Sequence, residues 1–174
     1  IGEGFVNFLK TLDAGRIALA ADIAACLYTG LITDTGSFRY AGTTPQTHAL
    51  AAELLETGIA FDSIAREVFD AVPFGYLGVL GTALERCQLE QEVAGGHGLV
   101  WTAVLAVDRA GDGLPFDLVE PIIDVVRKAS EAEVAMVVKE DDLGDLRVSL
   151  RSKGVADVSQ VAIGLGGGGH RYAA

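Results

Sequence analysis

Several features that define other protein classes are scarce or missing in this sequence of 174 residues. Only two cysteines occur, Cys26 and Cys87, and both lie in apolar helical patterns, which argues against a disulfide scaffold or a cysteine-rich zinc site. No apolar stretch reaches the roughly 18 to 20 residues that a membrane span requires. A soluble protein without a membrane partner is therefore expected.

Basic residues are also few. Lysine and arginine total 13 against 24 acidic residues, which gives a formal net charge of −11. A protein that grips long nucleic acid needs a broad Lys/Arg surface, so long duplexes are not expected partners, whereas a small anion in one basic pocket is compatible with this charge. The N-terminus shows no basic segment followed by an apolar run, so a cytoplasmic location is expected.

The first part of the chain is predicted to be helical. A buried helix is expected at 17–31, ending near Gly30, followed by a loop of Thr33 to Gly36. Thr44 and Pro45 have the residue types of an N-cap and a first helical position. Helices are predicted at 45–57, from Phe61 to the stop at Pro73, and at 75–88.

The second part alternates strands and helices. Strands are predicted at 99–107, 132–139 and 146–152, and helices at a segment ending near Ala129 and at 157–165. Tyr172 to Ala174 looks like the start of another helix. The fold class is thus α/β, with a helical segment at 1–73, a connecting helix at 74–90, and a small α+β domain with a mixed sheet at 91–174.

The glycine run before His170 is the first candidate site. Gly167, Gly168 and Gly169 lack a Cβ, so their backbone N–H groups could converge on a phosphate. A flexible hinge is the alternative that glycine runs alone favour. Strand residues Arg147, Ser149 and Arg151 share one face by period two, and arginine matches phosphate oxygens; a solvated sheet face is the alternative there.

Asp34 is the second candidate. It lies in a Thr-Asp-Thr-Gly sequence after a buried helix, where a carboxylate could ligate a hard divalent cation. An Asx-type turn or an N-cap is the structural alternative for a single aspartate. His48 and His97 receive no role.

Two segments together resemble signatures of the DHH phosphoesterases. They are residues 27–40, which contain Thr33-Asp34-Thr35-Gly36, and residues 167–174, which begin Gly-Gly-Gly-His. The first resembles the last metal-binding motif of that family's catalytic domain, and the second resembles the hallmark of its associated C-terminal domain. Ser149 to Ser152 resembles the strand motif that accompanies the glycine run. The compact layout is similar to the branch of nanoRNases and phosphoadenosine-phosphate phosphatases.

This resemblance implies a manganese-dependent hydrolase that cleaves short oligoribonucleotides or 3′-phosphoadenosine 5′-phosphate, with two metal ions activating a hydroxide. It implies that Asp34 is a metal ligand and a catalytic residue, that the full-length protein is a homodimer, and that the substrate lies in a cleft between domains. The substrate-binding residues that it implies are Ser149, Arg151, Gly167, Gly168, Gly169 and His170.

The sequence departs from the family pattern because it contains no Asp-His-His triplet and no upstream Asp-x-Asp segment. The chain is therefore expected to be a fragment that is inactive alone. Two other functions stay open: a non-catalytic nucleotide-binding module, and a hydrolase of the pyrophosphatase or exopolyphosphatase kind.

Overall fold

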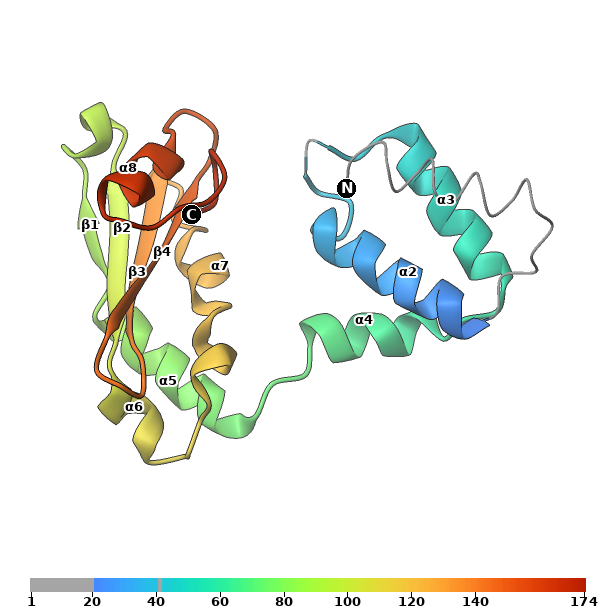
Figure 1. Ribbon diagram of the computed structural model, residues 1–174, viewed down its shortest axis with the longest axis horizontal. Helices are drawn as coiled ribbons and strands as arrows, with labels where there is room; N and C mark the ends of the chain where they lie inside the picture. Colours follow the sequence, from blue (N-terminus) through green and yellow to red (C-terminus); the bar gives the residue numbers. More distant parts are fainter. Residues whose placement is uncertain (1–20, 41) are drawn as a thin grey trace. The chain divides into compact units, whose positions relative to one another are not determined.

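The computed structural model describes residues 21–40 and 42–174. The chain forms two compact units, Ile1–Ala71 and Val72–Ala174. Figure 1 shows helices in the first unit and a sheet with helices in the second. The mixed α/β class predicted from the sequence is confirmed.

The described part of the first unit consists of three helices, α2 (Ala21–Asp34), α3 (Pro45–Glu56) and α4 (Phe61–Phe69). Apolar side chains of α2 and α3, together with Ile59, form its core, because each helix presents an apolar stripe to the other. The buried members are Ala24, Tyr28, Leu31, Ile32, Ala51, Leu54 and Ile59.

The ends of these helices test the sequence predictions. The hydroxyl of Thr44 accepts a hydrogen bond from the backbone N–H of Thr47, which confirms the predicted N-cap of α3. The prediction that the preceding helix ends near Gly30 is wrong, since α2 continues to Asp34. A glycine without a left-handed φ is tolerated within a helix at modest cost. The predicted helix from Phe61 ends at Phe69, before Pro73.

The second unit is built around one four-stranded sheet in the order β1-β2-β3-β4. The strands β2 and β3 are parallel, and the other neighbouring pairs are antiparallel. The elements are, in chain order, α5 (Phe74–Glu85), β1 (Gln88–Glu90), η1 (Ala94–Gly96), β2 (Leu99–Val104), α6 (Ala106–Ala110), η2 (Phe116–Val119), α7 (Ile122–Val126), β3 (Val134–Glu140), β4 (Leu146–Ser152) and α8 (Val158–Gly164).

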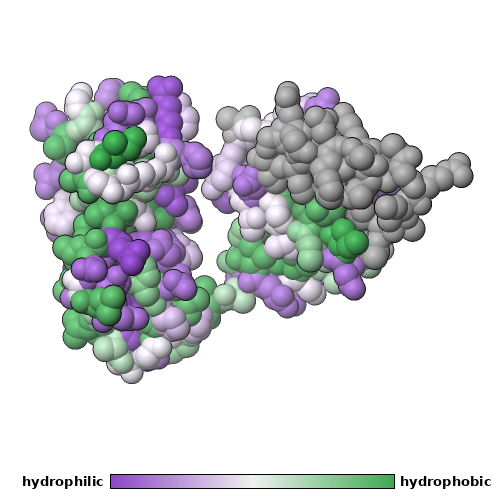
Figure 2. All heavy atoms as spheres, in the orientation of Figure 1, coloured by the Kyte–Doolittle hydropathy of each residue, from purple (hydrophilic) through white to green (hydrophobic). Residues whose placement is uncertain are grey.

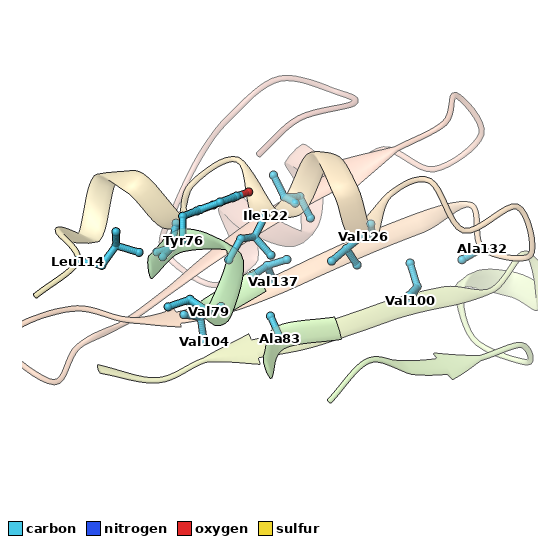
Figure 3. Close-up of a cluster of buried hydrophobic side chains, with 13 residues drawn as sticks. Tyr76, Val79, Ala83, Val100, Val104, Leu114, Ile122, Val126, Ala132 and Val137 are labelled. Atoms are coloured by element: carbon cyan, nitrogen blue, oxygen red, sulfur yellow. The ribbon is translucent and has the colours of Figure 1, made fainter. Parts of the chain in front are cut away.

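The two faces of the sheet are covered by different helices. Side chains of α5 and α7, among them Tyr76, Val79 and Ile122, converge on the strands in the larger core (Figure 3). A smaller cluster of Val134, Leu150 and Val158 joins the sheet to α8. Apolar side chains of α8 also reach the surface, and Figure 2 shows them among polar ones on the visible face of this unit.

The chain divides between Ala71 and Val72, close to the expected end of the helical segment at residue 73, and the segment expected to be a connecting helix belongs to the second unit. The reason is the packing of α5. Its residues Tyr76, Val79 and Ala83 are buried in the same core as the sheet, so this helix is part of the second unit rather than a connector.

Two further segments differ from the sequence predictions. The expected strand at 99–107 ends at Val104, and α6 begins at Ala106 with the carboxylate of Asp108 accepting from the Leu105 N–H at 2.8 Å. The helix expected to begin at Tyr172 is absent, because the backbone there pairs with β4 instead. Within the described residues, no helix combines the length and the apolar character of a bilayer span.

Candidate functional site

The glycine run begins as the cap of helix α8. The N–H of Gly166 donates to the carbonyl of Ile163, and the N–H of Gly167 donates to the carbonyl of Ala162 at 2.8 Å. With φ of +84° at Gly166, these two bonds make the Schellman motif that closes many helices. The amide of Gly167 is therefore used within the protein.

The next two glycines differ from Gly167 in their hydrogen bonding. Within the described residues, the backbone N–H groups of Gly168 and Gly169 donate no hydrogen bond. Both residues are exposed. Two adjacent, unpaired amide donors on a loop without Cβ atoms form a place where an anion can bind.

The C-terminal residues hold this loop against β4. The N–H of Leu150 donates to the carbonyl of Ala174, and the N–H of Ala174 donates to the carbonyl of Leu150 at 3.1 Å. The N–H of Ser152 donates to the carbonyl of Tyr172 at 3.0 Å. Ala173 forms isolated bridges with both Arg151 and His170. The backbone of a single residue thereby joins two of the predicted site residues.

Arg151 and Arg147 lie on the same face of β4 but differ in their partners. Arg147 forms an ion pair with Asp141 at 3.1 Å. The guanidinium of Arg151 donates only to the carbonyl of Leu150, at 3.0 Å, and forms no ion pair with any described carboxylate. It is partly exposed. Arg151 is therefore the arginine of this face whose charge is available to a bound anion.

Ser149 lies between the two arginines on β4, and its hydroxyl accepts a hydrogen bond from a buried lysine. The ammonium of Lys139, which is 1% exposed, donates to the hydroxyl of Ser149 at 2.7 Å and forms an ion pair with Glu120. The hydroxyl of Ser149 is within 3.5 Å of the same Glu120 oxygen. A buried ammonium needs such partners, and here they fix the rotamer of Ser149.

Glu133 organises the loop between β4 and α8. Its Oε1 accepts hydrogen bonds from the hydroxyl of Ser152 and from the backbone N–H groups of Gly154, Val155 and Ala156, at 2.7 to 3.2 Å. Burial raises the pKa of Glu133, but these four donors outweigh it and lower the pKa from 4.5 to about 2. The loop that leads to α8 and the glycine run is thus fixed by a carboxylate.

Asp34 is the last residue of α2 and is exposed. The turn after it is tightly held: the hydroxyl of Thr35 donates to the carbonyl of Leu31 at 2.7 Å, and Gly36 has φ of +56°. A Cβ on Gly36 would clash with the ring of Tyr40, so a larger residue here would displace that half-exposed side chain. The N-cap alternative for Asp34 is wrong, because the residue ends a helix.

A carboxylate at this helix end suits a cation. The C-terminal end of a helix carries a partial negative charge, which favours positive ligands and adds to the charge of Asp34. However, no group of three or more His, Cys, Asp or Glu residues within the described ranges could hold a metal ion. The residues present do not by themselves fit a two-metal centre.

The structure thus joins some predicted site residues and leaves others apart. Arg151, Gly169 and His170 are linked through Ala173 and Ala174. Ser149 is on the same strand face as Arg151, and Gly167 caps α8. Asp34 belongs to the other unit. The roles predicted for all of these residues stay predictions.

Sequence reasoning missed the polar residues that support this region, chiefly Lys139, Glu120 and Glu133. One signal for Lys139 was present. It follows five apolar residues of a strand, and a charge that continues a buried strand face needs a partner. Glu120 and Glu133 carried no comparable signal, since their partners are distant in sequence.

The chain has relatives among curated proteins. It is 31% identical over 163 residues to the bifunctional oligoribonuclease and PAP phosphatase NrnA of Thermus thermophilus, covering 94% of this chain and 47% of the relative. It is 28% identical over 158 residues to the probable bifunctional oligoribonuclease and PAP phosphatase NrnA of Streptococcus mutans, covering 91% of this chain and 49% of the relative. The chain thus spans about half the length of these relatives. No family model matches it.

A solved structure shares the fold. An exopolyphosphatase-related protein from Bacteroides fragilis superposes with a TM-score of 0.79 at 24% identity, over 88% of this chain and 44% of that protein. Both curated relatives are named as oligoribonuclease and PAP phosphatase, and the solved structure adds the fold alone. These relatives confirm the resemblance to the DHH phosphoesterases that was drawn from the two sequence motifs.

Proposed function

We propose that this chain supplies the nucleotide-binding part of a metal-dependent phosphoesterase that hydrolyses short oligoribonucleotides, 3′-phosphoadenosine 5′-phosphate, or both. The observation that carries the proposal is the combination of unpaired donors beside one strand. The amides of Gly168 and Gly169 and the guanidinium of Arg151 make no competing anionic contact within the described residues. His170 is exposed, and its backbone is joined to the same strand by the bridges through Ala173.

The chemistry of these groups suits a phosphate. Arginine presents a fork of N–H donors to phosphate oxygens, and glycine amides approach an anion closely because no Cβ intervenes. Serine supplies a hydroxyl that can contact a sugar, and a histidine ring can stack on a base or donate to phosphate. These residues bind and orient the ligand; none of them supplies a nucleophile.

The binding half of the proposal can be tested on this chain. Calorimetry with AMP in the presence of a chelator should detect binding, and Arg151→Gln should weaken it by about tenfold or more, because a charge-assisted contact contributes roughly 1.5 to 3 kcal/mol. Arg147→Gln is the matched control, since Arg147 lies on the same strand face but is paired with Asp141. Equal affinities for both variants would contradict the assignment of Arg151.

The catalytic half concerns Asp34. We propose that Asp34 is one ligand of a manganese site whose other ligands lie outside the described residues, in a longer, dimeric protein. The names of the relatives and the position of Asp34 at a helix C-terminus support this proposal. Manganese-dependent hydrolysis of a dinucleotide by the longer protein should fall at least a hundredfold in Asp34→Ala. Asp22→Ala, at the opposite end of α2, should keep full turnover.

A second function is favoured by one observation. Because the described residues contain no group of three or more His, Cys, Asp or Glu side chains that could hold a metal ion, a module that only binds nucleotides is compatible with the same site. Such a module would bind AMP, and the longer protein would release no mononucleotide from a dinucleotide with manganese present. Turnover that depends on manganese would exclude it.

A further inference from the structure

The second unit contains a pocket that the proposed nucleotide site does not use. It lies at the β3–β4 turn and has a volume of about 470 Å³, with Phe116, Glu120, Asp141, Asp142 and Arg147 among its lining residues. A volume of this size is in the range of small-molecule sites. The pocket shares the sheet face of Ser149, which contacts Glu120.

Most charged side chains of the pocket are already paired; the exception is the exposed Asp117, which forms no ion pair within the described residues. Glu120 is bound to Lys139, Asp141 to Arg147, and Asp142 to Arg109. An additional phosphate would meet several carboxylates here, and a metal ion would have to compete with three internal cations. The chemistry therefore favours a neutral ligand that donates hydrogen bonds to carboxylate oxygens.

The pocket also offers a flat surface. The ring of Phe116 lies between three cations, with the charged groups of Arg109, Lys139 and Arg147 at 5.4 to 5.8 Å from its centroid. The side chain of Arg147 is 64% exposed, so its planar guanidinium is accessible beside the ring. Aromatic rings and guanidinium planes are the surfaces on which nucleobases stack.

Glu120 is held in place as an acceptor. Its side chain is 48% exposed, and the contacts from Lys139 and Ser149 both involve Oε2. A carboxylate with one oxygen anchored by a buried ammonium keeps its orientation without a ligand. The amino and imino N–H groups of guanine, adenine or cytosine are suitable donors to such a group.

We propose that this pocket is a nucleobase subsite that holds the second base of a short oligonucleotide whose phosphate is bound at the glycine run. Arg151 is the fourth residue after Arg147, which places it about 13 Å further along the strand. That span exceeds what a mononucleotide bridges and suits a dinucleotide. The inference rests on the proposed function, because it takes the phosphate position from that site.

The test compares ligands that differ only in the second base. Calorimetry of this chain would measure AMP, the 5′-phosphorylated dinucleotide pApG, and an analogue of pApG without the second base. We expect pApG to bind about tenfold more tightly than the abasic analogue, as stacking of one base contributes roughly that factor or more. Glu120→Gln should remove this advantage, so that this variant binds pApG no more tightly than the abasic analogue.

The controls separate the inference from the proposed function. Glu92→Gln removes one exposed acidic charge outside the pocket and should keep the advantage of pApG. Equal affinity of the wild type for pApG and the abasic analogue would overturn the subsite while AMP binding still supports the phosphate site. An equal loss for AMP and pApG in Glu120→Gln would overturn it too, since Glu120 would then act only through Ser149. Absence of AMP binding would reject the proposed function itself.

Discussion

The C-terminal segment is fixed to β4 through a position that only glycine tolerates. Gly169 has φ of +149°, and a Cβ there would lie 2.4 Å from the Cα of Ala174 and 2.8 Å from the carbonyl oxygen of Ala173. Both contacts are with backbone, so no side chain can rotate away. Gly169→Ala should therefore either displace the C-terminal segment or strain the loop. Each of these outcomes has an expected cost in free energy.

Strain and detachment set the expected cost. A non-glycine residue in this region of φ costs about 1 to 3 kcal/mol, before the clash is counted. Detachment instead removes the hydrogen bonds that join residues 172–174 to Leu150, Ser152 and His170, at about 0.5 to 1.5 kcal/mol each. Because the protein adopts the cheaper outcome, we expect a local loss of roughly 2 to 3 kcal/mol.

Hydrogen exchange measures this loss where it occurs. The amides of Leu150 and Ser152 donate to Ala174 and Tyr172, so their protection reports whether the segment is docked. A loss of 2 kcal/mol lowers protection by about thirtyfold. Gly168→Ala is the control, because a Cβ at Gly168 meets nothing within 4 Å. Unchanged protection in Gly169→Ala, or an equal fall in both variants, would refute the reasoning.

Two other predictions concern carboxylates that hold loops of the second unit. The folded pKa of Glu133 lies below its ordinary value, so its stabilising contribution is full above about pH 5 and is lost as the pH falls towards 2. After allowance for solvent screening this amounts to about 1 to 2 kcal/mol, and urea unfolding should show a flatter acid profile in Glu133→Gln; a profile as steep as the wild type's would contradict it. Asp108→Asn should cost about 1 to 3 kcal/mol, because Asp108 accepts from Arg86 and from the Leu105 N–H with little exposure. Asp124→Asn, in an exposed pair, should change the same measurement by less than about 0.5 kcal/mol.

Local chemistry determined which elements could be predicted from the sequence. Thr44 caps α3 as expected, because an N-cap acts on amides two or three residues away. The strand β4 has the predicted bounds, since its alternation and its flanking turn are both local. The pairing of Tyr172 to Ala174 with β4 could not be predicted this way, because the edge of a strand accepts many sequences and leaves little pattern.

The candidate site likewise contains features that the sequence indicates and features that it does not. Gly168, Gly169 and Arg151 could be named from residue types that suit an anion. Gly167 instead caps α8. Its role depends on where the helix ends, and sequence patterns locate a helix end only to within a few residues. The partners of Ser149 come from β3 and from the residue after η2, so no spacing rule connects them.

The distribution of charge bears on the length of ligand that the proposed site accepts. With a net charge of −11, the protein repels a polyanion at distances up to the screening length of about 8 to 10 Å at physiological salt. Two acidic groups near β4 are paired, however: Asp141 with Arg147 and Glu120 with Lys139. Arg151 keeps its charge for a ligand. A ligand with one or two phosphates therefore gains a local contact and meets limited repulsion, whereas each further phosphate adds repulsion without a matching cation. Affinity should accordingly stop rising beyond a few nucleotides.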